Sequence, residues 1–403
     1  MINRAFLQAG HAPTLLAAFF YFDMSFMVWV ILGPLGVAIG NELHLDAAQK
    51  GLMVAVPVLA GAALRVVNGV LVDRIKPKPT GLIGQAIVIG GLFMAWISGV
   101  HSYAGVLMLG VVLGFAGASF AVALPLASRW YPPEYQGIAL GIAGAGNSGT
   151  VFAALFAPGL AAAFGWINVL GIAIIPLVVA LAVYIVLAKD APNQPPPKSL
   201  VQYMSVLRTG DAWWFMFFYS VTFGGFVGLA SSLTIYFNAE YGLSPITAGY
   251  FTAACVFAGS LVRPVGGGIA DRIGGIRALS VFYTVAAIAI GLVSFRPPQS
   301  WMALALFVVG MLALGMGNGS VFQLVPLRFR REIGVMTGLV GMFGGVGGFY
   351  LASSLGISKQ YTGSYQSGLL VFAILALVAL VGLTSIKSRW RTTWGAALAA
   401  ARI

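Results

Sequence analysis

The amino-acid sequence predicts an all-α protein that crosses a membrane many times. Hydrophobic residues fill 60% of the 403 positions, whereas Asp, Glu, Lys and Arg together fill only 8%. A soluble domain carries about 25% charged residues, so this chain has too little charge to cover a water-facing surface. Its apolar runs are continuous, unlike the alternating pattern of a membrane β-barrel, and reach the roughly 20 residues that a spanning helix needs. These observations exclude a soluble enzyme, a secreted disulfide scaffold and a disordered chain.

Twelve spans are expected from the apolar runs that lie between charge clusters and Gly or Pro residues. The first six are expected at 13–40, 47–72, 80–100, 102–127, 136–164 and 167–188. The second six are expected at 211–240, 246–270, 276–295, 301–328, 332–356 and 366–388. We therefore expect a polytopic membrane protein with two bundles of six helices, in residues 1–188 and 211–388.

A polar, proline-rich stretch at 189–198 separates the two expected bundles. Because proline cannot continue a helix, we expect a cytoplasmic linker at 189–210, and a cytoplasmic tail at 389–403. Within the linker, residues 199–208 place apolar side chains at helical spacing and are expected to lie along the membrane surface.

Basic residues are distributed unevenly between the two sets of loops. If both termini are cytoplasmic, the cytoplasmic segments hold 17 of the 22 Lys and Arg residues and the outer loops hold three. Cytoplasmic loops collect Lys and Arg, so we expect a multi-pass protein of the cytoplasmic (inner) membrane with both termini cytoplasmic. The net charge of +12 then reflects membrane topology, and no nucleic-acid partner is expected.

The two halves of the chain repeat each other. Arg65 and Arg263 are 198 residues apart, and so are the Asp-Arg pairs at 73–74 and 271–272. Six plus six helices built from such a repeat are the plan of a secondary transporter, in which two bundles rock about a central site.

A glycine-containing motif ends the second and eighth expected spans. It reads Gly69-x-x-x-Asp73-Arg74 in the first half and Gly267-x-x-x-Asp271-Arg272 in the second. It resembles the inner-loop motif of the major facilitator superfamily. The resemblance implies the major facilitator fold, with two pseudo-symmetric six-helix bundles. The residues to which it assigns a role in conformational change are Asp73, Arg74, Asp271 and Arg272.

Two arginines stand inside expected spans. Arg65 and Arg263 each lie eight residues before the motif aspartate, which is about 12 Å along a helix. An arginine at the bilayer centre costs roughly 2.5–3.5 kcal/mol on insertion scales, so such residues are kept chiefly where they face an interior cavity. Pairing with a buried acid or reaching back to the surface would also explain them. Asp23 is the only clear intramembrane carboxylate, so at least one arginine lacks an acidic partner.

Two guanidinium groups that face each other across the pseudo-symmetry axis predict a binding site for a planar oxyanion. The donor fork of arginine matches two oxygens at once, which the point charge of lysine does not. The excess of positive charge favours an anion and disfavours cations.

Glycine-rich strings occupy the fifth and eleventh expected spans, at 141–149 and 341–348. Small residues allow close helix packing, and glycine at this density also adds flexibility. The string Gly144-x-Gly146-Asn147-x-Gly149 resembles the signature of the nitrate/nitrite porter family (NarK/NasA type), and it coincides with the two buried arginines.

This resemblance covers essentially the whole chain and implies secondary active transport of nitrate by alternating access. The substrate-binding residues that it implies are Arg65, Arg263, Asn147, Tyr219, Phe120 and Phe223. The arginines would clamp nitrate, the amide and hydroxyl would hydrogen-bond it, and the rings would form walls. Taken singly, each aromatic is as easily explained as ordinary core, and Phe26 is a weaker candidate. The flexible gating glycines that it implies are Gly144, Gly146, Gly149, Gly341, Gly344 and Gly345.

Asp23 is the candidate for proton coupling. A buried carboxylate costs free energy unless it is paired or protonated. The stretch around Asp23 resembles the branch of the family that imports nitrate with protons, so we expect nitrate/proton symport. Nitrate/nitrite antiport is the alternative mode. For Asp23 itself the alternative is a purely structural role, in which it pairs with an arginine or caps a polar network.

No enzymatic activity, cofactor or metal site is expected. The three histidines fall in tails or outer loops, Cys255 is the only cysteine, and Asp23 alone cannot supply paired catalytic groups. The repeat and its central linker also argue against a channel. The expected partners are nitrate, or nitrite, together with protons and the lipid bilayer, and the protein is expected to be a monomer.

Overall fold

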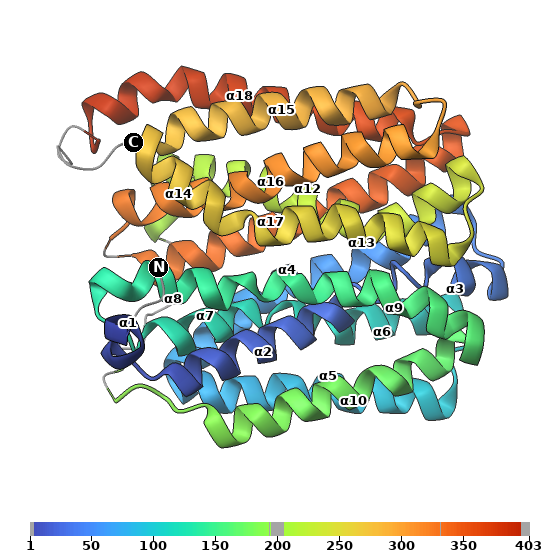
Figure 1. The fold of residues 1–403 in the computed structure, drawn as a ribbon, viewed down its shortest axis with the longest axis horizontal. Helices are drawn as coiled ribbons and strands as arrows, with labels where there is room; N and C mark the ends of the chain where they lie inside the picture. The colour runs from blue at the N-terminus through green and yellow to red at the C-terminus, as the bar shows by residue number, and fades with distance from the viewer. Residues whose placement is uncertain (1–3, 193, 195–204, 331, 396–403) are drawn as a thin grey trace.

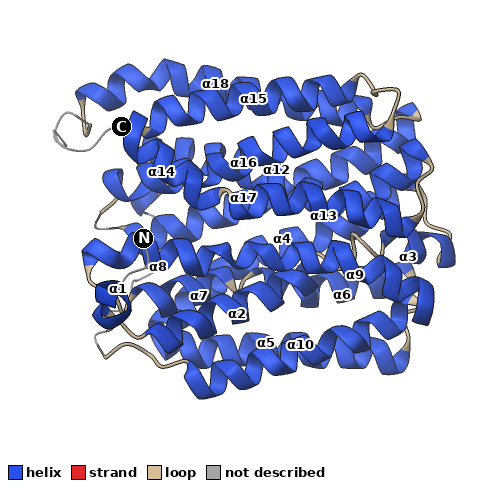
Figure 2. Cartoon of the chain, in the orientation of Figure 1, coloured by secondary structure: helices blue, strands red, loops and turns tan. Residues whose placement is uncertain are grey.

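The computed structural model describes residues 4–192, 194, 205–330 and 332–395. Within these residues every regular element is a helix (Figure 2), and twelve segments are long and apolar enough to cross a membrane. The prediction of an all-α membrane protein with twelve spans is therefore confirmed. Most of the surface segment expected at 199–208 lies outside the described residues.

The N-terminal half contains six spans, preceded by the short helix α1 (Arg4–Ala9). Four of its spans are formed by α2 (Ala12–Trp29), which the short α3 (Gly36–Glu42) follows, and by α4 (Ala47–Ile75), α5 (Pro77–Ser98) and α10 (Trp166–Leu187). The fourth span in chain order consists of α6 (Tyr103–Gly117) and α7 (Phe120–Ser128). The fifth consists of α8 (Pro133–Gly144), the 3₁₀ helix η1 (Ala145–Ser148) and α9 (Gly149–Phe164).

The C-terminal half contains the other six spans. They are α12 (Gly210–Tyr241), α13 with α14 (Pro245–Leu261 and Arg263–Ile273), α15 (Gly275–Ser294), α16 (Ser300–Arg328), α17 (Ile333–Thr362) and α18 (Gln366–Thr392). Figure 1 shows the two halves side by side, with their helices running roughly parallel to the longest axis.

Polar side chains cap helices where the chain enters a span. The Asp46 side chain accepts a bond of 2.8 Å from the backbone N–H of Gln49, and the Gln49 Oε1 accepts one of 3.0 Å from the backbone N–H of Asp46. This reciprocal pair starts α4 by satisfying amide groups that lack partners within the helix. Ser102 caps α6 in a similar way, by accepting a bond of 3.1 Å from Gly105.

Four of the expected spans are not single helices. The breaks lie after Trp29 in the span expected at 13–40, at 118–119 in the span at 102–127, at η1 in the span at 136–164, and at Val262 in the span at 246–270. Pro264 explains the last break, because its ring nitrogen has no hydrogen to donate to the preceding turn. Non-helical backbone at membrane depth is tolerated only where protein or a cavity surrounds it. At 118–119 the side chains of Arg65 and Asn68 from α4 meet the broken backbone.

The two halves pack together toward one end of the molecule. We call the end that carries α1 and the last turn of α18 the termini end, and the end that carries α3 the opposite end (Figure 1). The contacts between halves run along α4 and α17, α9 and α13, and α3 and α12.

Close contacts between the halves lie on the side of the opposite end. A Cβ atom added at Gly356 of α17 would fall 2.6 Å from the Ala47 carbonyl oxygen and 2.7 Å from the Gly51 Cα. At the termini end, α8 packs on α2 and α7, and α14 packs on α15 and α16, each within its own half. The molecule is therefore closed toward the opposite end.

Candidate functional site

Arg65 lies in the middle of α4 and is only 1% exposed. Its Nε donates a hydrogen bond of 3.2 Å to the carbonyl oxygen of Gly117, and its Nη1 donates to the carbonyl oxygen of Gly341. The second bond joins the two halves, because Gly341 belongs to α17. Nη2 is buried and has no hydrogen-bond partner in the part of the chain that the structure describes. One face of this guanidinium is thus fixed, while one donor group remains available.

The break between α6 and α7 supplies the carbonyl group that holds Arg65. At a helix end the last carbonyl groups have no partner within the helix. The carbonyl of Gly117 accepts from Arg65, and that of Ala118 accepts a bond of 3.2 Å from the Asn68 side chain. Two polar side chains of α4 therefore bind the carbonyl groups that the break leaves without partners in the helix. The break also places Phe120 at the first position of α7.

Aromatic rings surround the Arg65 guanidinium. Its Cζ lies 5.0 Å from the centroid of Phe223, 5.1 Å from that of Phe120 and 5.3 Å from that of Trp29. Cation–π attraction of this kind is worth about 2 kcal/mol or more where water is excluded. These rings offset part of the cost of the buried charge without neutralising it.

Arg263, which belongs to the other half, also contacts the Phe120 ring. It is half-buried at the first position of α14, and its Cζ lies 5.8 Å from the centroid of Phe120 and 5.1 Å from that of Phe322. Its Nη1 is buried without a hydrogen-bond partner. In the described part of the chain, neither Arg65 nor Arg263 forms an ion pair. The two positive charges meet at Phe120 with no carboxylate between them.

Tyr219 and Asn147 contribute further unpaired polar atoms. The Tyr219 ring stacks on Phe223 with centroids 5.1 Å apart and meets Phe322 edge-on at 5.0 Å. Within the described residues, neither the Tyr219 hydroxyl nor the Asn147 Oδ1 has a partner at hydrogen-bond geometry, although the hydroxyl interacts with Arg263 electrostatically. Because a half-turn of the amide exchanges Oδ1 for the donor Nδ2, Asn147 can present either kind of group. Buried polar groups without partners are rare, so these atoms are candidate hydrogen-bonding groups for a bound ion.

The six predicted gating glycines all lie at close approaches between helices or beside the guanidinium groups. A Cβ at Gly144 would lie 4.0 Å from the Arg263 Cζ, and one at Gly341 would lie 3.7 Å from the Arg65 Nη1. Each of these two glycines thus faces the arginine of the other half. The other four leave room for close neighbours. Gly146 packs on the Phe22 ring, Gly149 on the backbone of α2, Gly344 on the Tyr219 ring and Gly345 on Ala62. This is the close packing that small residues permit, and a gating role for these glycines stays a prediction.

Asp23 is 3% exposed and lies on α2, away from any ion pair in the described residues. The Ser148 hydroxyl donates a bond of 2.7 Å to its Oδ1. Among the described residues Asp23 thus pairs with no arginine, whereas the other structural alternative, a cap on a polar network, agrees with the bonds from Ser148 and from the Gly149 backbone. Phe22, the residue before it, packs 5.8 Å from Phe120 and so links Asp23 to the arginine pair.

The two copies of the inner-loop motif differ. Asp73 forms an ion pair of 2.8 Å with Arg129, the residue that follows α7. In the second half Asp271 is exposed and takes part in no ion pair among the described residues. Arg328, the counterpart of Arg129 at the end of α16, pairs instead with Asp211 at the start of α12.

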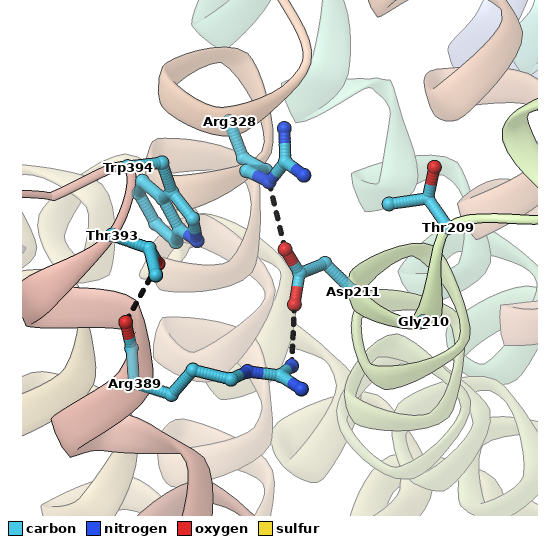
Figure 3. A pocket seen from close by; sticks show the side chains of 7 residues that line it. All are labelled: Thr209, Gly210, Asp211, Arg328, Arg389, Thr393 and Trp394. Atoms are coloured by element: carbon cyan, nitrogen blue, oxygen red, sulfur yellow. Dashed lines mark hydrogen bonds and ion pairs between the residues drawn. The ribbon is translucent and has the colours of Figure 1, made fainter.

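Asp211 joins three helices at the termini end. Arg328 donates 2.7 Å to its Oδ2, whereas Arg389 and Trp390 of α18 donate 2.6 Å and 2.8 Å to its Oδ1. Figure 3 shows the carboxylate between the two guanidinium groups, at the edge of a pocket of about 440 Å³. All its charged groups are mutually paired, so we assign this cluster a structural role.

Comparison with known proteins identifies the family. Residues 14–352 match the family model described as the Major Facilitator Superfamily. The chain belongs to the Major Facilitator Superfamily. The solved structure of a D-xylose–proton symporter superposes on this facilitator with a TM-score of 0.76 at 12% identity, covering 92% of this chain and 97% of the other. At that identity the likeness shows the fold alone.

Relatives place the facilitator among the nitrate/nitrite porters. The probable nitrate/nitrite transporter NarK2 of Mycobacterium tuberculosis is 33% identical over 376 residues, which cover 92% of this chain and 95% of the relative. The nitrite extrusion protein of Bacillus subtilis is 31% identical, covering 94% of each chain. The probable nitrate/nitrite antiporter NarK1 of Thermus thermophilus is 30% identical, covering 89% of this chain and 88% of the relative. The predicted membership of the nitrate/nitrite porter family is therefore confirmed.

Several residues of the porter's site were not among those predicted from its sequence. Phe322 lies four residues before Pro326, as Phe120 lies five before Pro125, so the internal repeat could have indicated it. Trp29 gave no comparable signal, because a tryptophan in a span is most often core. Phe26, the weaker candidate, packs on Phe22 and Trp29 rather than on a guanidinium.

Proposed function

We propose that this porter carries nitrate across the cytoplasmic membrane by alternating access. The observation that carries the proposal is the pair of guanidinium groups at Phe120, each with an unpartnered buried donor and neither with a carboxylate. A planar monoanion with three oxygens suits such a pair, because it accepts from two donor forks in one plane while aromatic rings cover its faces. The names of the relatives support nitrate and nitrite as the ions.

In this proposal the loaded site would satisfy the orphaned polar atoms. Nitrate would accept hydrogen bonds from Nη2 of Arg65 and Nη1 of Arg263, and from the Tyr219 hydroxyl and the Asn147 amide. Its negative charge would also screen the repulsion between the two guanidinium groups. The loaded protein would therefore close around the ion more readily than the same protein with two unscreened guanidinium groups.

We propose proton symport as the coupling mode, with Asp23 as the proton carrier. The supporting observation is that Asp23 is buried and that its donors, the Ser148 hydroxyl and the Gly149 backbone N–H, are both neutral, so that no cation among the described residues holds it ionised. Both termini are cytoplasmic in this proposal, and the state that is closed at the opposite end is the inward-facing one.

Nitrate/nitrite antiport is the second candidate. The repulsion between two unneutralised guanidinium groups favours it, because an empty carrier would return more slowly than one that holds another anion. The name of the Thermus thermophilus relative agrees with this mode.

Transport into proteoliposomes with external nitrate distinguishes the two modes. With no internal anion, a pH gradient that is acid outside should drive nitrate accumulation if the porter is a symporter. An exchanger should take up nitrate only after the vesicles are loaded with nitrite.

Asp23→Asn should abolish the accumulation driven by a pH gradient, because an amide cannot carry the proton, while nitrate exchange persists. Accumulation that still follows the imposed gradient in Asp23→Asn would refute the coupling role. Reconstituted protein with no nitrate flux in either condition would refute the substrate.

A further inference from the structure

Ser148 connects the candidate coupling residue to the candidate substrate ligands. Its hydroxyl lies 2.7 Å from the Asp23 Oδ1 and 2.9 Å from the carbonyl oxygen of Ala145. A hydroxyl has one hydrogen, so it can donate to only one of these two acceptors at a time. When Asp23 is ionised, the carboxylate is the stronger acceptor and takes the hydrogen.

Protonation of Asp23 changes the direction of this hydrogen bond. The carboxylic acid becomes a donor, and the Ser148 oxygen can accept from it. The hydroxyl hydrogen is then free to turn to the Ala145 carbonyl, which already lies within hydrogen-bond distance. No covalent bond other than that of the carried proton changes. The hydrogen bond from the Ser148 hydroxyl to the Ala145 carbonyl then closes the 3₁₀ turn between these two residues.

That turn contains Asn147. The segment η1 runs from Ala145 to Ser148. Asn147 therefore lies between the Ala145 carbonyl and the Ser148 hydroxyl, which are bonded to each other in one protonation state and not in the other. Thr150 donates a bond of 2.7 Å to the Asn147 carbonyl oxygen, which anchors this residue from the other side. A change at Ser148 therefore acts directly on the backbone that carries the Asn147 amide.

Close packing of α2 against η1 and α9 keeps Asp23 next to Ser148. A Cβ atom at Gly149 would lie 1.7 Å from the Asp23 carbonyl oxygen, so the backbones of α2 and α9 touch at this point. A Cβ at Gly146 would lie 2.4 Å from the Phe22 ring. Because both ends of η1 are pressed against α2, Asp23 and Ser148 cannot separate without moving a whole helix.

Other ionisable groups lie far along the elements that pack on α2. Those elements are α6, α7, α8, η1, α9 and α10. Between residues 145 and 164 there is no Asp, Glu, His, Lys, Arg or Tyr, and α7 has none either. The ionisable residues on the other three helices are Tyr103, Glu134, Tyr135 and Tyr184, each near a helix end. Arg263 faces Gly144 from the other half, next to η1.

We propose that Ser148 is a positioning residue that transmits the protonation state of Asp23 to Asn147 and so couples proton binding to nitrate binding. This inference rests on the proposed nitrate/proton symport. By linkage, a coupling between two sites appears as a dependence of the affinity for one ligand on the occupancy of the other. In the intact protein, the half-saturation concentration for nitrate should therefore fall as pH falls through the range in which Asp23 becomes protonated.

The test compares Ser148→Ala with wild type in proteoliposomes, with nitrate uptake measured over a range of pH. Without the hydroxyl donor the ionised carboxylate loses a charge-assisted bond, so the midpoint of the pH profile should move to higher pH by roughly one unit. The half-saturation concentration for nitrate should become nearly independent of pH. Ser148→Thr keeps the hydroxyl and should restore both properties.

Ser25→Ala is the matched control. Ser25 is also buried, lies on α2 two residues from Asp23, and donates a bond of 2.7 Å to the Tyr21 carbonyl oxygen without touching Asp23. It should keep the wild-type midpoint and the pH-dependent half-saturation. A shift as large in Ser25→Ala as in Ser148→Ala would overturn the proposal, since any lost hydroxyl would then suffice.

Two further outcomes separate the possible failures. If Ser148→Ala does not fold, Ser148→Cys replaces it with a weaker donor of similar size, and an intermediate shift supports the relay. Wild-type pH dependence in Ser148→Ala or Ser148→Cys, together with loss of proton-driven uptake in Asp23→Asn, overturns the relay and leaves the symport standing. Proton-driven uptake that survives in Asp23→Asn overturns the symport itself.

Discussion

At the scale of single residues, the two arginines of the repeat are held differently. Arg65 is buried in an unbroken helix, and two backbone carbonyl groups and three rings fix its guanidinium. Arg263 is half-buried at the start of α14, and its guanidinium lies against two rings and interacts with the Tyr219 hydroxyl. Residues that correspond in the sequence repeat are therefore unequal: the Arg65 guanidinium is fully buried and bound to two backbone carbonyls, whereas Arg263 is more exposed.

Replacement by lysine should reveal this inequality. A lysine retains the charge, but its three N–H groups radiate from one nitrogen and cannot reproduce the planar spread of donors that serves Gly117, Gly341 and nitrate. We expect Arg65→Lys and Arg263→Lys each to lower kcat/KM for nitrate by about tenfold or more, equivalent to about 1.4 kcal/mol, with the larger loss in Arg65→Lys. Initial rates of nitrate uptake measure this.

Lys50→Arg, which lies on the same helix as Arg65 but toward the opposite end, is the control and should retain wild-type kinetics. Unchanged nitrate affinity in both lysine variants would contradict the clamp.

At the scale of elements, the breaks within spans build the site. The interruption after Gly117 provides the carbonyl for Arg65, η1 carries Asn147 and Ser148, and the break before Pro264 starts α14 at Arg263. A continuous helix would consume all of these backbone groups in its own hydrogen bonds. The site therefore depends on irregular backbone that other helices complete.

Gly149 tests the contact between η1, α9 and α2. A Cβ there would collide with the Asp23 carbonyl group, and backbone atoms cannot turn aside as a flexible side chain can. We expect Gly149→Ala to cost about 1–3 kcal/mol through overpacking, and to lower both the melting temperature in detergent and nitrate uptake.

Gly141 provides the comparison on α8, since a Cβ there would meet no atom within 4 Å. Gly141→Ala should leave the melting temperature unchanged or raise it, because alanine favours the helix. Equal behaviour of the two variants would show that the contact at Gly149 is not tight.

Sequence patterns predict the spans, the repeat and the arginine pair, because all three depend on hydrophobicity and spacing along the chain. They do not predict the break at 118–119, since the side chains of Arg65 and Asn68 that satisfy it come from another helix. The same holds for Asp211, whose partners Arg328 and Arg389 are 117 and 178 residues away. Which acid pairs with which base is settled by the packing of helices, and the recurrence of the motif alone points to Asp271 instead.

At the scale of the whole molecule, closure at the opposite end is the feature that defines the observed state. The contact of Gly356 with Ala47 and Gly51 brings α17 and α4 together backbone to backbone. A transporter of this plan must separate these helices to admit an ion from that side. This interface is therefore one that transport must repeatedly form and break.

A bulky residue at this interface should shift the equilibrium between the states. We expect Gly356→Val to destabilise the closed contact by about 1–3 kcal/mol, and so to raise the population that is open at the opposite end roughly fivefold or more. Spin labels on cysteines at His44 and Tyr361, both exposed at that end, would report it in a Cys255→Ser background as a larger long-distance component.

Gly338→Val is the matched control for this measurement. Gly338 lies on the same helix toward the termini end, where an added Cβ would meet nothing within 4 Å. Its distance distribution should match that of the labelled parent. A shift in Gly338→Val equal to that in Gly356→Val would mean that the interface does not control closure.

The net charge of the arginine pair and Asp23 determines how transport responds to the membrane voltage. Two guanidinium groups and an ionised Asp23 give the empty site a net charge of +1. If one nitrate and one proton load together, the two guanidinium groups, the nitrate and the neutral Asp23 again give +1. Each unit charge that crosses the membrane changes the free energy by about 2.3 kcal/mol per 100 mV. Because the loaded and empty forms carry the same charge, voltage would act equally on the outward and return movements, and the chemical gradients alone would set the direction of the cycle.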